Sequence, residues 1–212
     1  MMVALVATSS CTTSKSVRLK VMTYNIHSAR DSNNETIAKI IKENNPDLVA
    51  LQEVERNTKI NPGDIPAIMA QLTDMGYYYF AHALNLKQGD YGNAILSKYP
   101  IIEGNTIKLG TQGKDYIRSF GYVKIEKEGE KIYFGVTHLD HMTDSLRLKQ
   151  VNQILEEIKD INKPFILAGD LNSVPDSPVI SKLKERFILG SKEDKLEWTD
   201  PAPVPNKTID YI

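Results

Sequence analysis

The feature that most limits the fold of this chain is an alternation, from residue 18 onward, of short apolar runs with amphipathic segments. Residues 34–43 carry isoleucines at helical spacing, and residues 48–51 follow as a buried strand. Residues 123–136 alternate apolar and polar side chains on both sides of a turn at Gly129, which predicts a β-hairpin. Because both helices and hairpins connect the strands, the sequence predicts an α/β protein with mixed sheets. Other strands are predicted at residues 19–24, 77–80, 94–96, 165–168 and 209–212, and other helices at residues 65–72 and 145–161.

Length and composition favour a single globular domain. The chain has 212 residues, of which 41% are hydrophobic and 25% charged, and this is too apolar for a disordered chain. Its formal net charge is -1, so no overall positive field exists to hold nucleic acid non-specifically. The single cysteine, Cys11, excludes an intrachain disulfide and a Cys-rich zinc site. Metal binding would therefore rely on oxygen and imidazole ligands.

The first 17 residues are interpreted as a leader outside the folded domain, which then covers residues 18–212. The apolar run Val3–Ala7 precedes small residues and Cys11, as in bacterial lipoprotein signals, whose cysteine receives a lipid. The run is too short to cross a bilayer, which takes about 20 apolar residues. This interpretation predicts a lipid anchor at Cys11 and a place in the bacterial cell envelope. The alternative is a frayed leader with an incidental cysteine, on a cytoplasmic protein.

Polar side chains collect at the carboxyl ends of the predicted strands. Asn25, Glu53 and His138 each end a different strand, and Asp170 with Asn172 follows another. Side chains that converge from several strand ends are how α/β folds assemble a site. An oxygen-rich cluster suits Mg²⁺, which takes few protein ligands and keeps waters for a substrate phosphate.

Six short motifs occur in the order seen in the endonuclease/exonuclease/phosphatase superfamily, and the chain resembles that family over nearly all of residues 19–212. The resemblance implies a four-layer sandwich of two packed mixed β-sheets flanked by helices. It also implies hydrolysis of phosphoester bonds with Mg²⁺ or Mn²⁺. The motifs are Thr23-Tyr24-Asn25-Ile26-His27, Leu51-Gln52-Glu53-Val54, Tyr91-Gly92-Asn93-Ala94-Ile95-Leu96-Ser97, Thr137-His138-Leu139-Asp140, Gly169-Asp170-Leu171-Asn172 and Ile209-Asp210-Tyr211-Ile212.

The resemblance implies distinct roles for five of these residues. Glu53 is the main metal carboxylate, and Asn25 is either a second metal ligand or a residue that orients the ion's surroundings. His138 contacts the scissile phosphate as a hydrogen-bond donor. Asp170 orients or deprotonates the attacking water, and Asn172 donates a hydrogen bond to the phosphoryl group. Asp170 and Asn172 lie two residues apart, so an extended backbone points both side chains the same way.

Four further residues are candidates for the site. By the resemblance, Asn93 orients a site residue such as His138, and Asp210 orients a histidine tens of residues later. Arg118 suits two phosphate oxygens, although a solvated arginine explains it equally well. Trp198 could line the substrate groove, but a lone tryptophan is more often a core residue. No Ser-Asp-His string follows Asp210 here. We therefore expect that the C-terminal strands are missing and that the sequence is a piece of a longer protein; the alternative is a naturally truncated protein with impaired activity.

The substrate class stays open at this level. The first hypothesis is a metal-dependent phosphodiesterase of nuclease type, acting as a monomer on a phosphoester that could be nucleic acid. The alternatives are an inositol-phosphate phosphatase or a sphingomyelinase-like phospholipid phosphodiesterase. A third possibility is a non-catalytic binding module, for which the missing histidine is the only support. The near-neutral charge argues against tight binding of duplex or single-stranded nucleic acid.

Overall fold

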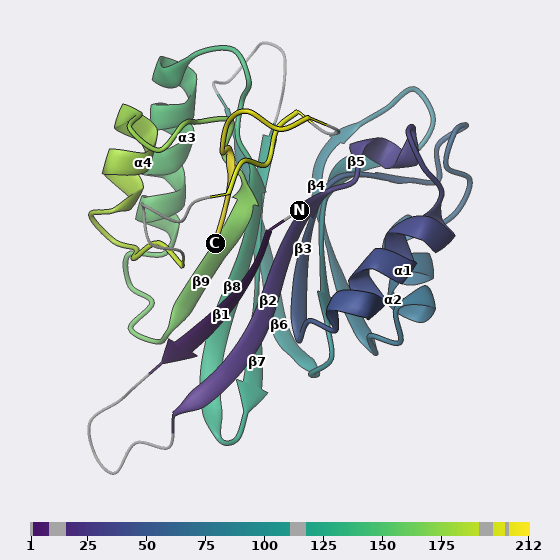
Figure 1. Cartoon of the computed structure of the whole chain (residues 1–212), viewed down its shortest axis with the longest axis horizontal. Coiled ribbons are helices and arrows are strands. Elements are labelled where there is room, and N and C mark those ends of the chain that lie inside the picture. Colours follow the sequence, from purple (N-terminus) through teal and green to yellow (C-terminus); the bar gives the residue numbers. More distant parts are fainter. Residues whose placement is uncertain (1, 9–15, 111–117, 191–196, 202–203) are drawn as a thin grey trace.

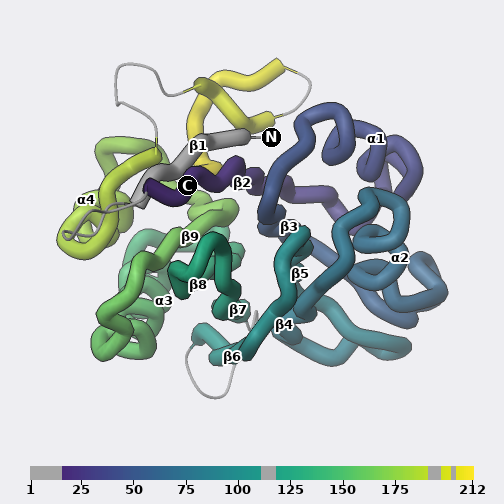
Figure 2. Tube along the Cα trace, turned by 90° about the horizontal axis from the view of Figure 1, so that it is seen from below, coloured from purple at the N-terminus to yellow at the C-terminus, as the bar shows by residue number. Residues whose placement is uncertain are grey.

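Two β-sheets pack face to face between two pairs of helices, so the molecule has four layers (Figure 1). The computed structural model describes residues 2–8, 16–110, 118–190, 197–201 and 204–212. Seen from below, the helices α1 (Asn34–Asn44) and α2 (Ile65–Leu72) cover one sheet, and α3 (Asp144–Glu157) and α4 (Pro178–Leu183) cover the other (Figure 2). The predicted four-layer sandwich is confirmed.

The first sheet has the strand order β1-β2-β3-β5-β4. β2 and β3 run parallel because α1 crosses between them, and the remaining neighbours are antiparallel. A short 3-10 helix, η1 (His27–Ala29), follows β2 directly. The strands are β1 (Met2–Thr8), β2 (Val17–Asn25), β3 (Leu48–Arg56), β4 (Tyr77–Asn85) and β5 (Asp90–Ser97).

The second sheet has the order β10-β9-β8-β7-β6. Its parallel pair is β8 and β9, which α3 connects, and the predicted hairpin is the antiparallel pair β7 and β8. The carboxyl ends of β2, β3, β8 and β9 therefore meet on one edge of the sandwich, at the top of Figure 1. The strands are β6 (Ile101–Leu109), β7 (Arg118–Lys127), β8 (Glu130–His138), β9 (Phe165–Asp170) and β10 (Asp210–Tyr211).

The core that holds the two sheets together consists of apolar side chains on their facing surfaces. Burial of apolar area is the main stabilising term in such a layer, at roughly 25 cal/mol per Å². Two further apolar layers lie under the helices, one beneath α1 and α2 and one beneath α3 and α4. Buried residues of the central layer include Val21, Leu48, Ala50, Ile95, Phe134, Val136 and Ile166.

Residues 2–8 form an edge strand, β1, and β2 begins at Val17, while the role of residues 1–17 as a leader remains a prediction. β1 pairs with β2 in antiparallel register, from Met2 opposite Thr23 to Thr8 opposite Val17. Cys11 lies outside the described residues, so the lipid anchor remains a prediction. Among the described helices, none combines the length and the apolar content that crossing a bilayer requires.

Helix ends follow local chemistry. α1 ends where Asn45 adopts a left-handed conformation (φ 47°) before Pro46, and Asn33 caps its start by accepting a hydrogen bond from the Thr36 amide. The helix predicted to reach residue 161 ends at Glu157, because Ile158 leaves helical geometry (φ -99°, ψ 4°). The apolar spacing continues past this point into a turn, which explains the overestimate.

At Gly169, β9 lies too close to β8 to leave room for a side chain. A Cβ atom at this position would lie 2.1 Å from the Thr137 carbonyl oxygen, whereas one at Gly76 would meet nothing within 4 Å. We expect Gly169→Ala to lower the free energy of unfolding by about 1–3 kcal/mol, the usual cost of overpacking. Urea denaturation compared with Gly76→Ala measures the difference. Equal midpoints for the two variants would contradict the close approach.

Candidate active site

Glu53 reaches the site because β3 is irregular at this residue. The pairing of β3 with β5 shifts register between Leu51 and Val54, and Glu53 has a left-handed backbone (φ 58°). Such a bulge changes the direction of a side chain, and a non-glycine residue in this conformation costs about 1–3 kcal/mol. The Ser28 hydroxyl donates a hydrogen bond to the Glu53 carbonyl at 3.2 Å, which helps to hold the conformation.

Asn25 links carboxylates that belong to the two different sheets. Its Nδ2 donates to Glu53 Oε1 at 3.0 Å and to Asp170 Oδ2 at 3.1 Å. Its Oδ1 accepts a hydrogen bond from the His27 amide at 3.0 Å, which fixes the orientation of the side chain. Residues that are 145 positions apart in the sequence thus meet in one cluster.

Asp170 and Asn172 form the turn that ends β9. Asp170 Oδ1 accepts the Asn172 amide at 3.0 Å, and Asn172 has a left-handed backbone (φ 48°). The Asn172 side-chain amide donates to the Leu139 carbonyl at 3.0 Å, which ties this turn to the end of β8. Burial raises the pKa of Asp170, and the hydrogen bond from Asn25 opposes this shift. Asp170 is therefore a stronger base than an exposed aspartate.

His138 faces Asp170 through one ring nitrogen and Arg118 through the other. Its Nε2 lies 3.6 Å from Asp170 Oδ2, and Arg118 Nη1 lies 3.2 Å from its Nδ1. A guanidinium only donates, so Nδ1 must accept and the proton of the neutral ring is on Nε2. Burial and the neighbouring Arg118 charge lower the pKa of His138 to about 3. The ring is thus a neutral donor aimed at the carboxylate cluster.

Arg118 carries a buried positive charge for which the described residues supply no carboxylate within 4.0 Å. Its side chain contacts the two imidazoles His138 and His141, at 3.2 and 3.4 Å. The residue is only 8% exposed, and its Nε has no hydrogen-bond partner in the described structure. A solvated arginine, the alternative drawn from the sequence, is therefore wrong. A desolvated guanidinium of this kind favours an anionic ligand.

Tyr91 is a site residue that the sequence reasoning did not single out. Burial raises the pKa of its hydroxyl, the Glu53 charge adds to that shift, and the Arg118 charge opposes it. The hydroxyl therefore lies within electrostatic reach of both the carboxylate and the cation. Tyr91 is the first residue of one of the six motifs, so the sequence did contain a signal for it. Its position in the motif did not show that its hydroxyl lies near Glu53 and Arg118.

Asp210 lies beside Asp170, because β10 pairs with β9 in that register. Burial and the charge of Asp170 raise the pKa of Asp210 to about 7. Two neighbouring carboxylates that resist joint ionisation favour either a shared proton or a nearby cation.

The donor set fits a hard divalent ion, although the described residues contain no group of three or more His, Cys, Asp or Glu side chains arranged to hold a metal. The carboxylates of Glu53 and Asp170 are hard donors that Asn25 Nδ2 holds side by side, while Asn25 Oδ1 accepts the His27 amide. Mg²⁺ characteristically uses one or two protein carboxylates and completes its shell with water and phosphate. A dense protein cage is therefore not required for such a site.

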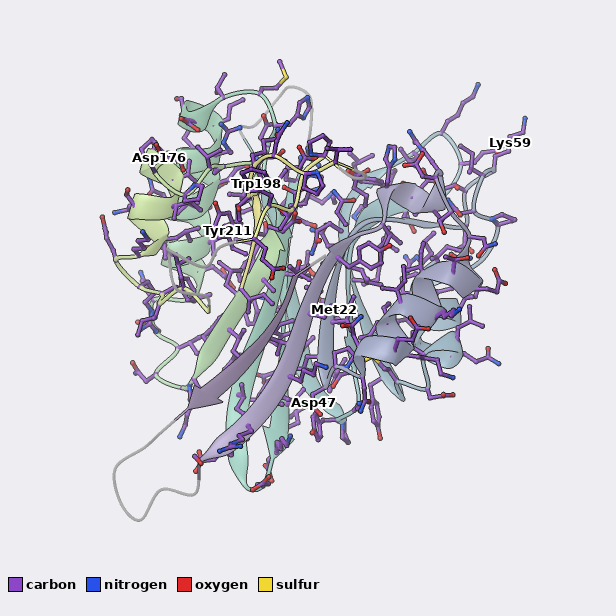
Figure 3. All side chains as sticks on the ribbon, in the orientation of Figure 1. Met22, Asp47, Lys59, Asp176, Trp198 and Tyr211 are labelled. Carbon is purple, nitrogen blue, oxygen red and sulfur yellow. The ribbon has the colours of Figure 1, made fainter. Side chains whose placement is uncertain are left out.

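Two predicted site residues are placed differently from the rest. Asn93 donates to the Ser119 carbonyl and hydroxyl at 3.1 and 3.2 Å, and not to His138, so it steadies the strand that carries Arg118. Trp198 is 64% exposed on the loop before β10 (Figure 3), so the core alternative is wrong for it. Its contact with a substrate remains a prediction.

The family assignment follows from comparison with known proteins. Residues 22–212 match the model of the endonuclease/exonuclease/phosphatase family, and the chain belongs to this family. Members of the family hydrolyse phosphoester bonds and typically use divalent metal ions. The chain is 27% identical over 182 residues to Protein angel of Drosophila melanogaster, which covers 78% of this chain and 48% of that protein. The chain thus spans about half the length of this curated relative.

Solved structures support the same fold. An endonuclease/exonuclease/phosphatase protein from Beutenbergia cavernae matches with a TM-score of 0.65 and 28% identity, over 76% of this chain and 49% of that one. A mannosyl-6-phosphatase from Bacteroides thetaiotaomicron matches with a TM-score of 0.69 and 20% identity, over 91% of this chain and 84% of that one. The second similarity concerns the fold alone.

The raised pKa of Asp210 predicts how stability changes with pH. The folded value of about 7 exceeds the unfolded value of about 4, so the folded state binds the proton more tightly. Stability is therefore lost as pH rises from about 4 to 7. In the presence of chelator, we expect Asp210→Asn to raise the melting temperature at pH 8 but not at pH 4. The exposed Asp160→Asn is the control, and equal effects at both pH values would contradict the assignment.

Proposed function

We propose that this protein is a divalent-metal-dependent phosphodiesterase of nuclease type. The observation that carries the proposal is the meeting of three kinds of group at one edge of the sandwich. These are the carboxylates Glu53 and Asp170 around the Asn25 amide, the neutral donor His138, and the buried cation Arg118. Hydrolysis of a phosphodiester needs a base for water, donors for the phosphoryl oxygens and neutralisation of charge.

The residues divide these tasks by their chemistry. Glu53 would hold the metal ion, with Asn25 either as a second ligand through Oδ1 or as the residue that orients the two carboxylates. When bound, Mg²⁺ or Mn²⁺ supplies Lewis-acid neutralisation of the phosphate and of the departing oxygen. Asp170 accepts the proton of the attacking water. Burial raises its pKa and makes it suitable for that step.

The remaining residues act on the phosphoryl oxygens. His138 donates from Nε2, because Arg118 occupies Nδ1. The Asn172 amide retains a second hydrogen for the substrate beyond the one given to Leu139. Arg118 offsets the negative charge that develops in the transition state. For Asp210 the proposal keeps the role implied by the family resemblance, which is to orient a partner imidazole. The proposed location, the cell envelope, and the proposed monomeric state rest on the sequence alone.

A phosphatase acting on a monoester is the second candidate. The fold is shared with a protein described as a mannosyl-6-phosphatase, and a buried arginine also suits the extra charge of a monoester. The two candidates differ in the number of substituents on the phosphate. The second substituent of a diester must fit beside Arg118, whereas a monoester leaves that space to a charged oxygen.

A substrate panel with and without chelator tests the proposed function. We expect hydrolysis of bis-para-nitrophenyl phosphate and short oligonucleotides with Mg²⁺ or Mn²⁺, and loss of turnover with excess chelator, because the phosphate charge is then unmet. Preference for para-nitrophenyl phosphate and inositol phosphates would favour the phosphatase, and hydrolysis of sphingomyelin would favour the phospholipid enzyme. Turnover that persists in chelator would contradict the metal role, and binding without any turnover would favour a binding module.

Substitution of His138 tests the donor role. We expect His138→Gln to lower kcat by about 10²–10³, the usual cost of losing one donor to a developing oxyanion. His82→Gln is the matched control, because His82 contacts Asn85 and Asp90 and lies outside the cluster. Initial rates on the same diester measure both variants. Equal rates for wild type and His138→Gln would contradict the assignment.

A further inference from the structure

A pocket lies near the carboxyl end of β3, the strand that carries Glu53. It has a volume of about 400 Å³ and is formed by the chain after η1, the loop after β3 and the loop between β4 and β5. We call it the basic pocket. Figure 3 shows Lys59 away from Trp198. The lining of the basic pocket includes Arg30, Glu55, Lys59, Ile60, Leu86 and Lys87.

The buried carboxylate of the basic pocket, Glu55, already has its hydrogen-bond partners within the protein. It is 3% exposed, and its Oε2 accepts hydrogen bonds from Thr58 Oγ1 at 2.5 Å and Asn61 Nδ2 at 3.1 Å. Its Oε1 lies 3.6 Å from Arg30 Nη2. The single carboxylate of the pocket is therefore satisfied within the protein by two hydrogen bonds and one ion pair.

Two lysines give the basic pocket an excess of positive charge. Lys59 and Lys87 are exposed, and within the described part of the chain neither has a carboxylate within 4.0 Å. Together with Arg30, they give the pocket three cationic side chains against the one carboxylate of Glu55. Ile60 and Leu86 add apolar walls and are 66% and 37% exposed. The pocket thus offers charge for an anion and apolar surface for an uncharged group attached to it.

The basic pocket is coupled to the active site through short connections. Glu53 and Glu55 lie two residues apart on β3, so their backbones are separated by roughly 7 Å. Ser28 donates to the Glu53 carbonyl at 3.2 Å, and its own carbonyl accepts Asn61 Nδ2 at 3.0 Å. The inner wall of the pocket, formed by Glu55 and Arg30, therefore lies close to Glu53, and a chain-like ligand held at Glu53 reaches the pocket as it leaves the active site.

We propose that the basic pocket binds a second phosphate group of the substrate, one that does not take part in the reaction. The inference rests on the proposed function and narrows it to substrates with at least two phosphates. A short single-stranded oligonucleotide fits best, because its backbone phosphates meet the lysines and its sugar or base meets Ile60 and Leu86. An inositol polyphosphate offers the same charge but lacks the apolar group.

The test compares two double variants that remove equal charge. Lys59→Gln/Lys87→Gln changes the pocket. Lys131→Gln/Lys163→Gln, the control, removes two exposed lysines at the amino ends of β8 and β9, away from the active site. Binding of a fluorescein-labelled ten-nucleotide DNA strand is measured by anisotropy in chelator at several salt concentrations. For the pocket variant we expect Kd to rise about tenfold at low salt and the log–log salt slope to fall by about 1.4. The control variant should match wild type.

Kinetics give the second readout. With metal, the pocket variant should show a KM for the oligonucleotide raised about tenfold and a kcat within twofold of wild type, because a remote phosphate contributes uniform binding. Hydrolysis of bis-para-nitrophenyl phosphate, which has one phosphate, should be unchanged. An inositol polyphosphate competitor should displace the DNA more weakly than an unlabelled oligonucleotide. Stronger displacement would assign the pocket to inositol phosphates instead of nucleic acid.

The outcomes separate the two proposals. If the wild-type protein hydrolyses none of the substrates, and DNA affinity falls in the pocket variant but not in the control variant, the proposed function is overturned and the pocket is retained. Hydrolysis with identical Kd and KM in the two double variants would overturn the pocket and retain the proposed function. Equal loss on the oligonucleotide and on bis-para-nitrophenyl phosphate would also overturn the pocket, because the lysines would then act on the scissile group or on folding.

Discussion

The candidate active site depends on the hydrogen bonds by which Asn25 joins Glu53 and Asp170 across the two sheets. Apolar packing between the sheets aligns the ends of β2 and β3 with the end of β9, and the amide then holds the two carboxylates within reach of one donor. Without that link, each carboxylate would be a solitary strand-end group, the usual fate of Asp and Glu on a protein surface. The chemistry of the site thus follows from how the layers pack.

Opposite charges at this edge are kept apart. Burial raises the pKa values of Asp170 and Asp210, and the charge of Asp170 adds to the shift of Asp210. Burial and the Arg118 charge together lower the pKa of His138 and keep it neutral. One side of the cluster therefore favours a cation or a proton, and the other favours an anion. A phosphoester bound with a divalent ion satisfies both sides at once, because the ion meets the carboxylates and the phosphate oxygens meet Arg118.

Much of this arrangement could be predicted from the sequence, because strand ends are marked by apolar runs that stop at polar residues. Asn25, His138 and Asp170 were placed at one edge on that basis, and they do meet there. The position of the Glu53 side chain could not be predicted in this way, because β3 continues past it to Arg56. The side chain reaches the site only because the Glu53 backbone is left-handed. Neither apolar spacing nor motif order encodes such a bulge.

Contacts between distant side chains were beyond sequence reasoning. Asn93 binds Ser119 and not His138, and the partner of His138 is Arg118, because the register of β7 against β8 decides which side chains face each other.

The central claim, that Glu53 and Asp170 work in one site, is tested most directly by a double-mutant cycle. We expect Glu53→Gln/Asp170→Asn to lower kcat/KM of diester hydrolysis little more than the more damaging single substitution does. Losses that simply multiply would contradict a shared site.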